Sequence, residues 1–339
     1  MKRIGSVFEV IISPEILDKA SKLACKTRKN KNEVISFLEK KDILLEKLHK
    51  ELSEGTYRSS EYRMFVINEK GKDRWVADLP LYPDRVVHWA ICLVVEDRLN
   101  KSLIDQTYAC VKGRGQHDAV NKVCEYIRKD HRLRYALTID VRKFFQSIDK
   151  DILKNKLESK FKDRRFLNLM FQLIDEYPHD GIPLGNRYSP MLANLYLSDL
   201  DHLLKERYHV HYIVSFMDDR CILGYSKIWL HKIRGIIDEE LKKMKLELKK
   251  NYQVFPIDKR GILFLGYRIY SDHVMLSKTT KKRMIAACEV IRERDEKDMI
   301  FMAEHDRGTL ASYHGVLSHC DGLHLHHIYI DPLMKRIER

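Results

Sequence analysis

Apolar residues recur along the chain at two spacings, one typical of helices and one typical of strands. Residues 33–53 carry apolar side chains at roughly helical spacing, and Gly55 ends that pattern. The same spacing, with Pro83 at the start of one segment, predicts further helices at 83–100, 117–129, 149–161, 165–175, 189–207, 228–246 and from 278 onward.

Shorter apolar or alternating runs predict strands. Residues 64–79 alternate like two short strands joined by the turn NEKGKD, and 135–141 predict a buried strand with acidic Asp140 near its end. The segment YIVSFMDDRCILGYS predicts a hairpin with carboxylates at its tip, and 262–270 predict one more strand. Because helices and strands mix without strict alternation, we expect an α+β fold with an antiparallel sheet.

Net charge points to a polyanionic partner. The 339 residues carry 62 Lys and Arg against 49 Asp and Glu, a formal charge of +13. Nucleic acid fits this charge, and so does an anionic membrane. No apolar stretch reaches about 18 residues, so we expect no transmembrane helix. The seven cysteines show no CxxC spacing, which favours a reducing, cytoplasmic setting without a disulfide framework.

Two acidic sites stand out, Asp140 at the end of a strand and the pair Asp218 and Asp219 at a hairpin tip. Strands hold carboxylates rigidly, and hard oxygen ligands suit Mg²⁺, which keeps water and substrate phosphates in its other positions. Two such ions can activate a hydroxyl and stabilise a leaving oxygen in phosphoryl transfer. An isolated Asp-Asp pair is also typical of a solvated turn, so the flanking sequence has to decide.

The flanking sequence resembles reverse transcriptases. YIVSFMDDRCILG resembles their F/Y-x-D-D signature, and LTIDVRKFFQSID resembles their first catalytic motif. GIPLGNRYSPMLANLYL lies between the two, where the family places its next motif, and FLGYRI (264–269) is similar to the primer-gripping strand. GKDRWV and TYACVKGRGQHDAV resemble finger segments of bacterial enzymes related to group II introns.

This resemblance implies a right-hand polymerase with N-terminal helices and fingers in 1–135, a palm with interleaved fingers segments in 136–270, and a short helical thumb in 271–339. It implies that Asp140, Asp218 and Asp219 are catalytic and bind two Mg²⁺ ions, with Mn²⁺ as an alternative. The Val141 carbonyl would be a backbone ligand. The enzyme would add dNTPs to a 3′-OH on an RNA template.

The resemblance also implies a nucleotide site. Phe145 matches the aromatic residue that excludes a ribose 2′-OH, although either it or Phe144 can instead be a core residue. The other residues implied to bind the dNTP are Lys72, Arg74, Phe144, Leu184, Gly185 and Lys249, with Lys250 as an alternative to Lys249. Those implied to contact template or primer are Arg85, Lys112, Arg114, Asn186 and Gly266.

Two positions separate the possible subgroups. Leu184 stands where intron enzymes usually carry Gln, which resembles diversity-generating retroelement enzymes. Ser189-Pro190 follows the intron pattern instead, and this favours a defence-associated reverse transcriptase over a diversity-generating one. Both types imply a structured noncoding RNA as partner, and no membrane partner is expected. An accessory protein or a homo-oligomer is compatible with either type.

Three alternatives stay open at this point. Synthesis can be template-independent or protein-primed, with a Tyr or Ser hydroxyl in place of the primer end. The chain can be a non-catalytic RNA-binding protein on a polymerase scaffold, although the intact carboxylates argue against this. The C-terminal segment SYHGVLSHCDGLHLHH invites a zinc site, but its spacing matches no zinc template, so we favour a packed thumb helix with exposed histidines.

Overall fold

The computed structural model describes residues 3–26, 28, 30–69, 71–250, 252–296 and 304–337. The chain forms two compact units, and each is assembled from three separate segments. Unit 1 consists of Met1–Gly113, Val141–His209 and Ile236–Lys249, and unit 2 of Arg114–Asp140, Val210–Gly235 and Lys250–Arg339. The linear division into fingers, palm and thumb therefore stays a prediction beside these interleaved units.

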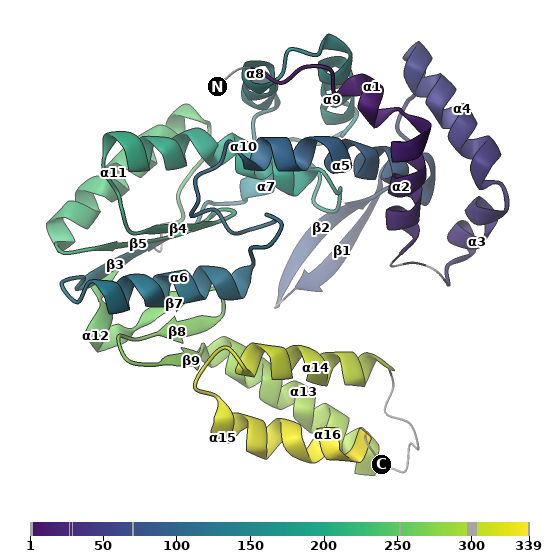
Figure 1. Cartoon of the computed structure of the whole chain (residues 1–339). Coiled ribbons are helices and arrows are strands. Elements are labelled where there is room, and N and C mark those ends of the chain that lie inside the picture. The colour runs from purple at the N-terminus through teal and green to yellow at the C-terminus, as the bar shows by residue number, and fades with distance from the viewer. Residues whose placement is uncertain are drawn as a thin grey trace. The chain divides into compact units, whose positions relative to one another are not determined.

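Unit 1 is mostly helical, with one two-stranded antiparallel hairpin (Figure 1). Its elements are α1 (Phe8–Ile11), α2 (Pro14–Cys25), α3 (Asn32–Glu39), α4 (Lys41–Glu54), β1 (Arg63–Glu69), β2 (Lys72–Asp78), η1 (Leu81–Arg85), α5 (Val86–Asn100), α7 (Phe144–Ser147), α8 (Lys150–Lys160), α9 (Arg164–Asp175), α10 (Ser189–His202) and η2 (Leu203–Arg207). Helices α5 and α10 are buried over most of their surface and form the core of the unit.

The helix predicted over 33–53 is two helices, and this part of the prediction is wrong. The helical path breaks at Lys40 (φ −121°, ψ 17°), between α3 and α4. Ile35, Leu38 and Ile43 of the predicted apolar side are exposed. Gly55 ends α4 in the left-handed conformation, as the sequence predicts.

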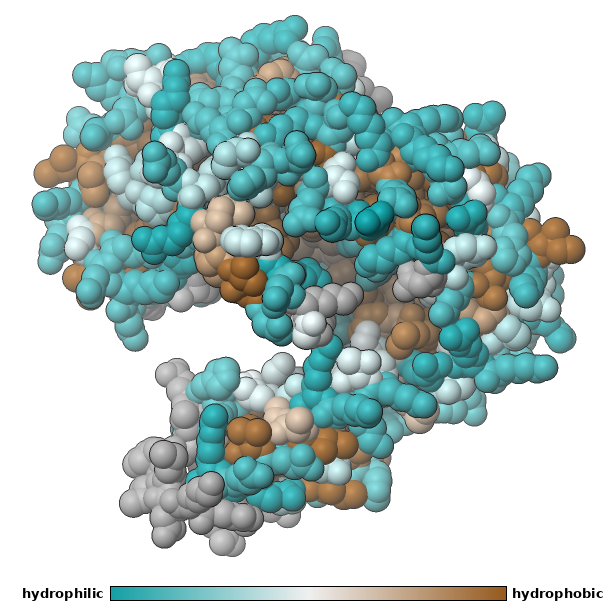
Figure 2. Space-filling model, turned by 180° about the vertical axis from the view of Figure 1, so that it is seen from behind, coloured by the Kyte–Doolittle hydropathy of each residue, from teal (hydrophilic) through white to brown (hydrophobic). Residues whose placement is uncertain are grey.

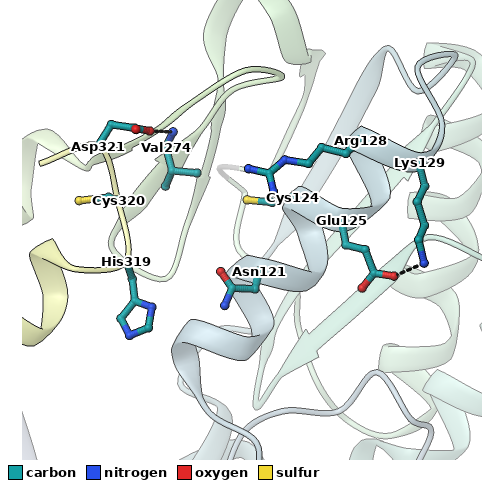
Figure 3. Close-up of a pocket in the computed structure, with 9 residues that line it drawn as sticks. All are labelled: Asn121, Cys124, Glu125, Arg128, Lys129, Val274, His319, Cys320 and Asp321. Atoms are coloured by element: carbon teal, nitrogen blue, oxygen red, sulfur yellow. Dashed lines mark hydrogen bonds and ion pairs between the residues drawn. The ribbon is translucent and has the colours of Figure 1, made fainter.

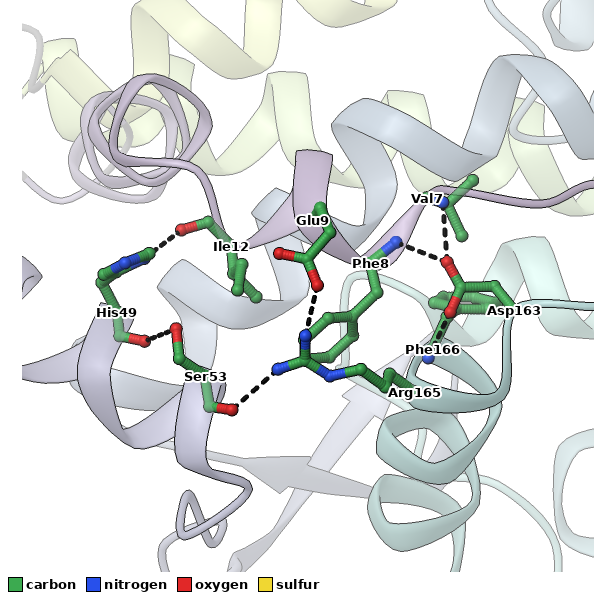
Figure 4. Close-up of polar contacts among 9 residues, drawn as sticks. All are labelled: Val7, Phe8, Glu9, Ile12, His49, Ser53, Asp163, Arg165 and Phe166. Carbon is green, nitrogen blue, oxygen red and sulfur yellow. Dashed lines mark hydrogen bonds and ion pairs between the residues drawn. The ribbon is translucent and has the colours of Figure 1, made fainter.

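The N-terminal segment of unit 1 is fixed to α9 by polar contacts (Figure 4). The Asp163 carboxylate accepts hydrogen bonds from the backbone N–H groups of Val7, Phe8 and Phe166, at 2.8, 2.9 and 3.3 Å. Arg165 pairs with Glu9 and stacks over the Phe8 ring. Because Asp163 also caps the N-terminus of α9, one carboxylate connects two elements distant in sequence.

Unit 2 contains two antiparallel sheets followed by helices (Figure 1). Its elements are α6 (Gln116–Lys129), β3 (Tyr135–Ile139), β4 (Ile213–Phe216), β5 (Asp219–Gly224), β6 (Gln253–Pro256), α12 (Ile257–Arg260), β7 (Ile262–Phe264), β8 (Tyr267–Ile269), β9 (Val274–Leu276), α13 (Lys278–Glu296), α14 (Glu304–Leu317), α15 (Leu323–Leu325), η3 (His326–Ile330) and α16 (Asp331–Ile337). Helix α11 (Lys227–Lys243) begins in unit 2 and ends in unit 1.

The larger sheet has the strand order β4-β5-β3-β6, and every pairing in it is antiparallel. The central strands β3 and β5 are buried over most of their length, which explains their apolar sequences. Helix α6 packs against β4, where the Tyr126 hydroxyl donates to the Ile213 carbonyl. The sequence predicted neither β6 nor β9.

The single strand predicted over 262–270 is a hairpin, so this prediction is also wrong. Leu265 and Gly266 both adopt positive φ, +47° and +83°, and reverse the chain between β7 and β8. Strand β9 pairs with β8 and completes the small sheet. Helices α13, α14 and α16 then gather around η3 (Figure 1).

The mixture of helices with antiparallel sheets confirms the predicted α+β class. In the described residues, we find no helix with both the length and the apolar character needed to cross a bilayer. Figure 2 shows hydrophilic residues over most of the drawn face, with hydrophobic ones in scattered patches.

Candidate active site

The acidic pair lies on the hairpin formed by β4 and β5, as the sequence predicts. Phe216 pairs with Asp219, which leaves Met217 and Asp218 as the two turn residues. Met217 adopts φ +54°, and a positive φ in the first turn position suits the twist of a tight hairpin. The turn therefore presents Asp218 at the tip and Asp219 at the start of β5.

The third carboxylate reaches the same end of the sheet. Strand β3 pairs antiparallel with β5, and its last pair is Ile139 with Arg220. One further step of this register places Asp140 beside Asp219. Residues directly opposite each other in antiparallel strands share a face of the sheet and have Cβ atoms about 5 Å apart. Asp140, Asp218 and Asp219 are all half-buried and come together in unit 2.

This donor set fits a divalent cation of the Mg²⁺ type. Three carboxylates supply hard oxygen ligands from rigid strand ends. Across the described residues, no three His, Cys, Asp or Glu side chains are already arranged as a metal cage. Mg²⁺ is commonly bound by one or two carboxylates together with water and substrate phosphates, so a ready-made cage is not required.

Phe144 and Phe145 differ in burial. Phe144 is 3% exposed and belongs to the core of unit 1, while Phe145 is half-buried. Their rings meet edge to face with centroids 5.6 Å apart. The structure therefore makes Phe145 the more accessible of the two.

The loop 181–186 joins Phe145 to the hairpin of unit 1. Ile182 N–H donates to the Phe145 carbonyl at 2.9 Å, and Ala77 N–H on β2 donates to the Leu184 carbonyl at 2.8 Å. Gly181 has φ +75°, and a Cβ there would lie 2.1 Å from the Phe145 oxygen. The loop thus connects the Phe145 backbone with β2 through Ile182 and Leu184, and the nucleotide site stays a prediction.

Asn186, predicted to contact the template, is 6% exposed. Its amide group donates to the hydroxyls of Tyr62 and Tyr188, at 2.9 and 3.1 Å. A template contact at this position would therefore involve the backbone or a rearranged side chain.

The lysine and arginine side chains predicted to bind the triphosphate differ from one another in exposure and in the element that carries them. Lys249 is half-buried while Lys250 is exposed, and Val141 bridges to Leu248 beside them. Arg74 is exposed on β2 opposite Ile67. Lys72 begins β2, but its side chain lies outside the described residues.

The predicted template and primer residues are distributed over both units. In unit 1, Arg85 forms an ion pair with Asp78 and donates to the Leu79 carbonyl at 2.9 Å, while Lys112 is exposed. In unit 2, Arg114 is half-buried and Gly266 lies at the β7–β8 turn. The Arg85 head group therefore has a structural partner within unit 1.

Arg220, to which the sequence analysis gave no role, lies on strand β5 of the acidic hairpin itself. Arg220 is 1% exposed and donates to the Met217 carbonyl at 3.2 Å. The sequence signal was a second charged residue, directly after Asp219, at the start of the apolar run CILG. Its neighbour Cys221 is also buried, and burial raises the pKa of that thiol, which keeps it neutral.

The histidines of the C-terminal segment contact one another and their neighbours. His314 Nδ1 and His326 Nε2 form a hydrogen bond of 2.6 Å. The Asp331 carboxylate forms ion pairs with both His326 and His327. His319 stacks on His117 of α6, with centroids 3.8 Å apart.

A pocket of about 460 Å³ lies between α6, β9 and the residues after α14 (Figure 3). It contains the ion pair of Lys129 with Glu125, and Asp321 accepts from the Val274 N–H. None of the three carboxylates lines this pocket.

Comparisons with known proteins concern the family and the fold of the chain. The family model described as reverse transcriptase (RNA-dependent DNA polymerase) matches residues 67–269, more than half of the chain. The group II intron-encoded protein LtrA of Lactococcus lactis subsp. cremoris is 23% identical over 267 residues, covering 74% of this chain and 44% of LtrA. Protein YkfC of Escherichia coli (strain K12) is 23% identical, covering 61% of this chain and 58% of YkfC.

The chain thus spans about half the length of these curated relatives. Among solved structures, apo telomerase from Candida tropicalis superposes with a TM-score of 0.51 at 11% identity, over 74% of this chain and 56% of the telomerase chain. That likeness concerns the fold alone and is consistent with right-hand polymerase architecture. By the match over residues 67–269, the chain belongs to the reverse transcriptase (RNA-dependent DNA polymerase) family.

Proposed function

We propose that this chain is an RNA-directed DNA polymerase that adds dNTPs to a 3′-OH. The observation that carries the proposal is the convergence of Asp140, Asp218 and Asp219 at one end of an antiparallel sheet in a chain of this family. A non-catalytic RNA-binding scaffold would have no need for three half-buried carboxylates at one site.

The carboxylates would hold two Mg²⁺ ions, or Mn²⁺ in their place, and the Val141 carbonyl would be a further ligand. When bound, such ions activate the primer hydroxyl and stabilise the leaving oxygen. The residues of the chain bind and orient the substrates. Lys249, Arg74 and Lys72 would neutralise the triphosphate.

Sugar selection is proposed to lie in unit 1. Phe145 is the accessible aromatic ring, and its carbonyl is fixed by the Ile182 N–H, so the ring has a stable backbone beneath it. A ring held in this way would leave no room for a ribose 2′-OH and would favour dNTPs.

Template and primer are proposed to bind through phosphates. With 62 Lys and Arg residues, the chain can neutralise many phosphates without reading sequence. Lys112 and Arg114 are the proposed fingers contacts, and Gly266 is the proposed primer contact. Its turn is fixed by the Ser277 N–H, which donates to the Gly266 carbonyl at 2.9 Å.

Primer extension tests the proposal. The purified chain is incubated with oligo(dT) annealed to poly(rA), dTTP and MgCl₂. We expect extension of the DNA primer that depends on the RNA template. Failure to extend primers both on this template and on a mixed-sequence RNA would overturn the proposal.

For the biological role, we propose that the enzyme copies a dedicated noncoding RNA in an antiphage defence system. Ser189-Pro190 supports this role over diversification. Leu184 supports the second candidate, a diversity-generating retroelement enzyme that makes mutagenised cDNA. Sequencing RNA and cDNA co-purified from cells separates the two, because cDNA rich in changes at template adenines would contradict the defence role.

A further inference from the structure

Arg220 occupies an unusual place for a charged side chain. It lies on β5, a central strand of the larger sheet, opposite Ser215 on β4 and Ile139 on β3. The rest of the strand beyond it, Cys221–Gly224, is buried. A charged group that is 1% exposed is tolerated only when polar groups compensate for its lost hydration.

The compensating groups include the carbonyls of the acidic turn. Arg220 Nη1 donates to the Met217 carbonyl at 3.2 Å and lies 3.5 Å from the Asp218 carbonyl. The contact with Met217 is the shorter of the two. Successive residues of a strand point to opposite faces, so Arg220 reaches the turn from the face opposite to that of Asp219.

The backbone of the turn is itself strained. Met217 adopts φ +54°, a backbone conformation that residues other than glycine rarely adopt. Such a conformation persists only where the surrounding structure holds it in place. Arg220 supplies a hydrogen bond to the carbonyl of that same residue.

We propose that Arg220 is a positioning residue that fixes the Met217–Asp218 turn and thereby sets the direction of the Asp218 carboxylate. This inference rests on the proposed catalytic role of Asp218. Arg220 would act through the backbone of the turn. Both carbonyls are approached by one nitrogen, Nη1, whose position is fixed by the rigid plane of the guanidinium, so charge alone is not sufficient.

The test compares Arg220→Lys and Arg220→Gln with a control on the same strand, Cys221→Ala. Lys keeps the charge but loses the planar fork, whereas Gln loses the charge and keeps one amide donor. Cys221 is equally buried, but its side chain points to the other face of the sheet. The control therefore loses packing without losing the contact to the turn.

Amide hydrogen exchange of residues 213–224 is the first readout. In Arg220→Lys we expect exchange at the turn to be faster by about tenfold or more, because its opening is no longer opposed by the guanidinium. Cys221→Ala should leave exchange at the turn within about twofold of the parent. If the amide exchange rates at the turn in Arg220→Lys and Arg220→Gln equalled those of the parent protein, the proposal would be overturned.

Steady-state kinetics are the second readout. For both Arg220 variants we expect kcat to fall about tenfold or more while KM for dTTP changes less than about twofold. If only the positive charge mattered, the kcat of Arg220→Lys would stay near that of the parent and only the kcat of Arg220→Gln would fall. That result would contradict the proposal.

The two readouts separate this inference from the proposed function. If the parent protein extends no primer, the proposed function fails, while the exchange result still decides whether Arg220 holds the turn. If Arg220→Lys does not fold, the neutral Gln variant, which buries no charge, carries both measurements.

Discussion

Phe145 is the residue whose chemistry is most open to direct test. It is half-buried, packs edge to face on buried Phe144, and is proposed to exclude the ribose 2′-OH. Replacing it with Val should open that space and raise incorporation of UTP relative to dTTP by about 10- to 100-fold. Competition assays on poly(rA) with oligo(dT) measure the ratio, and an unchanged ratio would contradict the proposed role.

Gly181 is a residue where the backbone leaves little choice. It has φ +75°, and an added Cβ would lie 2.1 Å from the Phe145 carbonyl oxygen. We expect Gly181→Ala to lower the free energy of unfolding by about 1–3 kcal/mol. Gly235, inside α11 with open space around it, is the matched control, because Ala there should stabilise the helix by about 0.5–1 kcal/mol. Urea denaturation that ranks the two variants in the opposite order would contradict this account.

The sequence predicted the acidic hairpin but few of the contacts around it. Local pattern predicted a hairpin tip at residues 217–220, whereas the structure confines the turn to 217 and 218, and the register that brings Asp140 beside Asp219 was not predicted. The partners of Asn186 and Arg85 could not be foreseen, because Tyr62 and Asp78 reach them only through the tertiary fold. The contact of Arg220 with the turn depends on the rotamer of one buried side chain, which no periodicity encodes.

At the scale of elements, Asp163 connects the N-terminal segment to α9. Burial acts to raise the pKa of this carboxyl, but hydrogen bonds from the backbone N–H groups of Phe8, Phe166 and Val7 outweigh it, so the pKa lies below the ordinary value of 3.8. A lowered folded pKa means that the stabilisation is fully present above pH 3.8 and is lost as the pH falls through the folded pKa.

Asp163→Asn should therefore lower the melting temperature at neutral pH and show a smaller further loss on acidification than the parent does. Asp42, whose side chain is 95% exposed, provides the control substitution to Asn and should behave like the parent. Thermal unfolding followed from about pH 7 to pH 3 measures both effects. Parallel pH profiles for Asp163→Asn and the parent would refute the role of this carboxylate.

Helices with clear periodicity and the two hairpins β1–β2 and β4–β5 were predictable as elements, and the errors have local physical causes. The break between α3 and α4 occurs at Lys40, which is not a typical helix breaker, and the exposed apolar residues Ile35 and Leu38 gave a misleading pattern. The reversal between β7 and β8 requires positive φ at Leu265 as well as Gly266, and only the glycine carries a sequence signal.

At the scale of the whole molecule, the surplus of +13 charges predicts binding that depends strongly on salt. If cations neutralise several phosphates of an RNA–DNA duplex, a plot of log affinity against log salt concentration should have a slope of about −3 or steeper. Fluorescence anisotropy with a labelled duplex in KCl from about 100 to 300 mM measures it. A slope near zero would mean that this charge does not serve nucleic-acid binding.

The order of the motifs along the chain revealed the family, but not the way the chain is assembled. Both compact units draw on three segments, so residues adjacent in sequence, such as Asp140 and Val141, belong to different units. Long-range assembly of this kind depends on which apolar faces pack against each other. A single sequence indicates which residues form an apolar face, but it does not indicate the element against which that face packs.

The most direct measurement of the central claim is the single-turnover rate of dTTP addition to oligo(dT) on poly(rA) by three proteins. The first is the parent, the second is Asp218→Ala, and the third is Asp258→Ala, which removes an exposed carboxylate on α12 of the same unit. We expect a loss of about 1,000-fold or more in Asp218→Ala and a rate within about twofold of the parent in Asp258→Ala. Equal rates for the parent and Asp218→Ala would contradict a catalytic role of the acidic site.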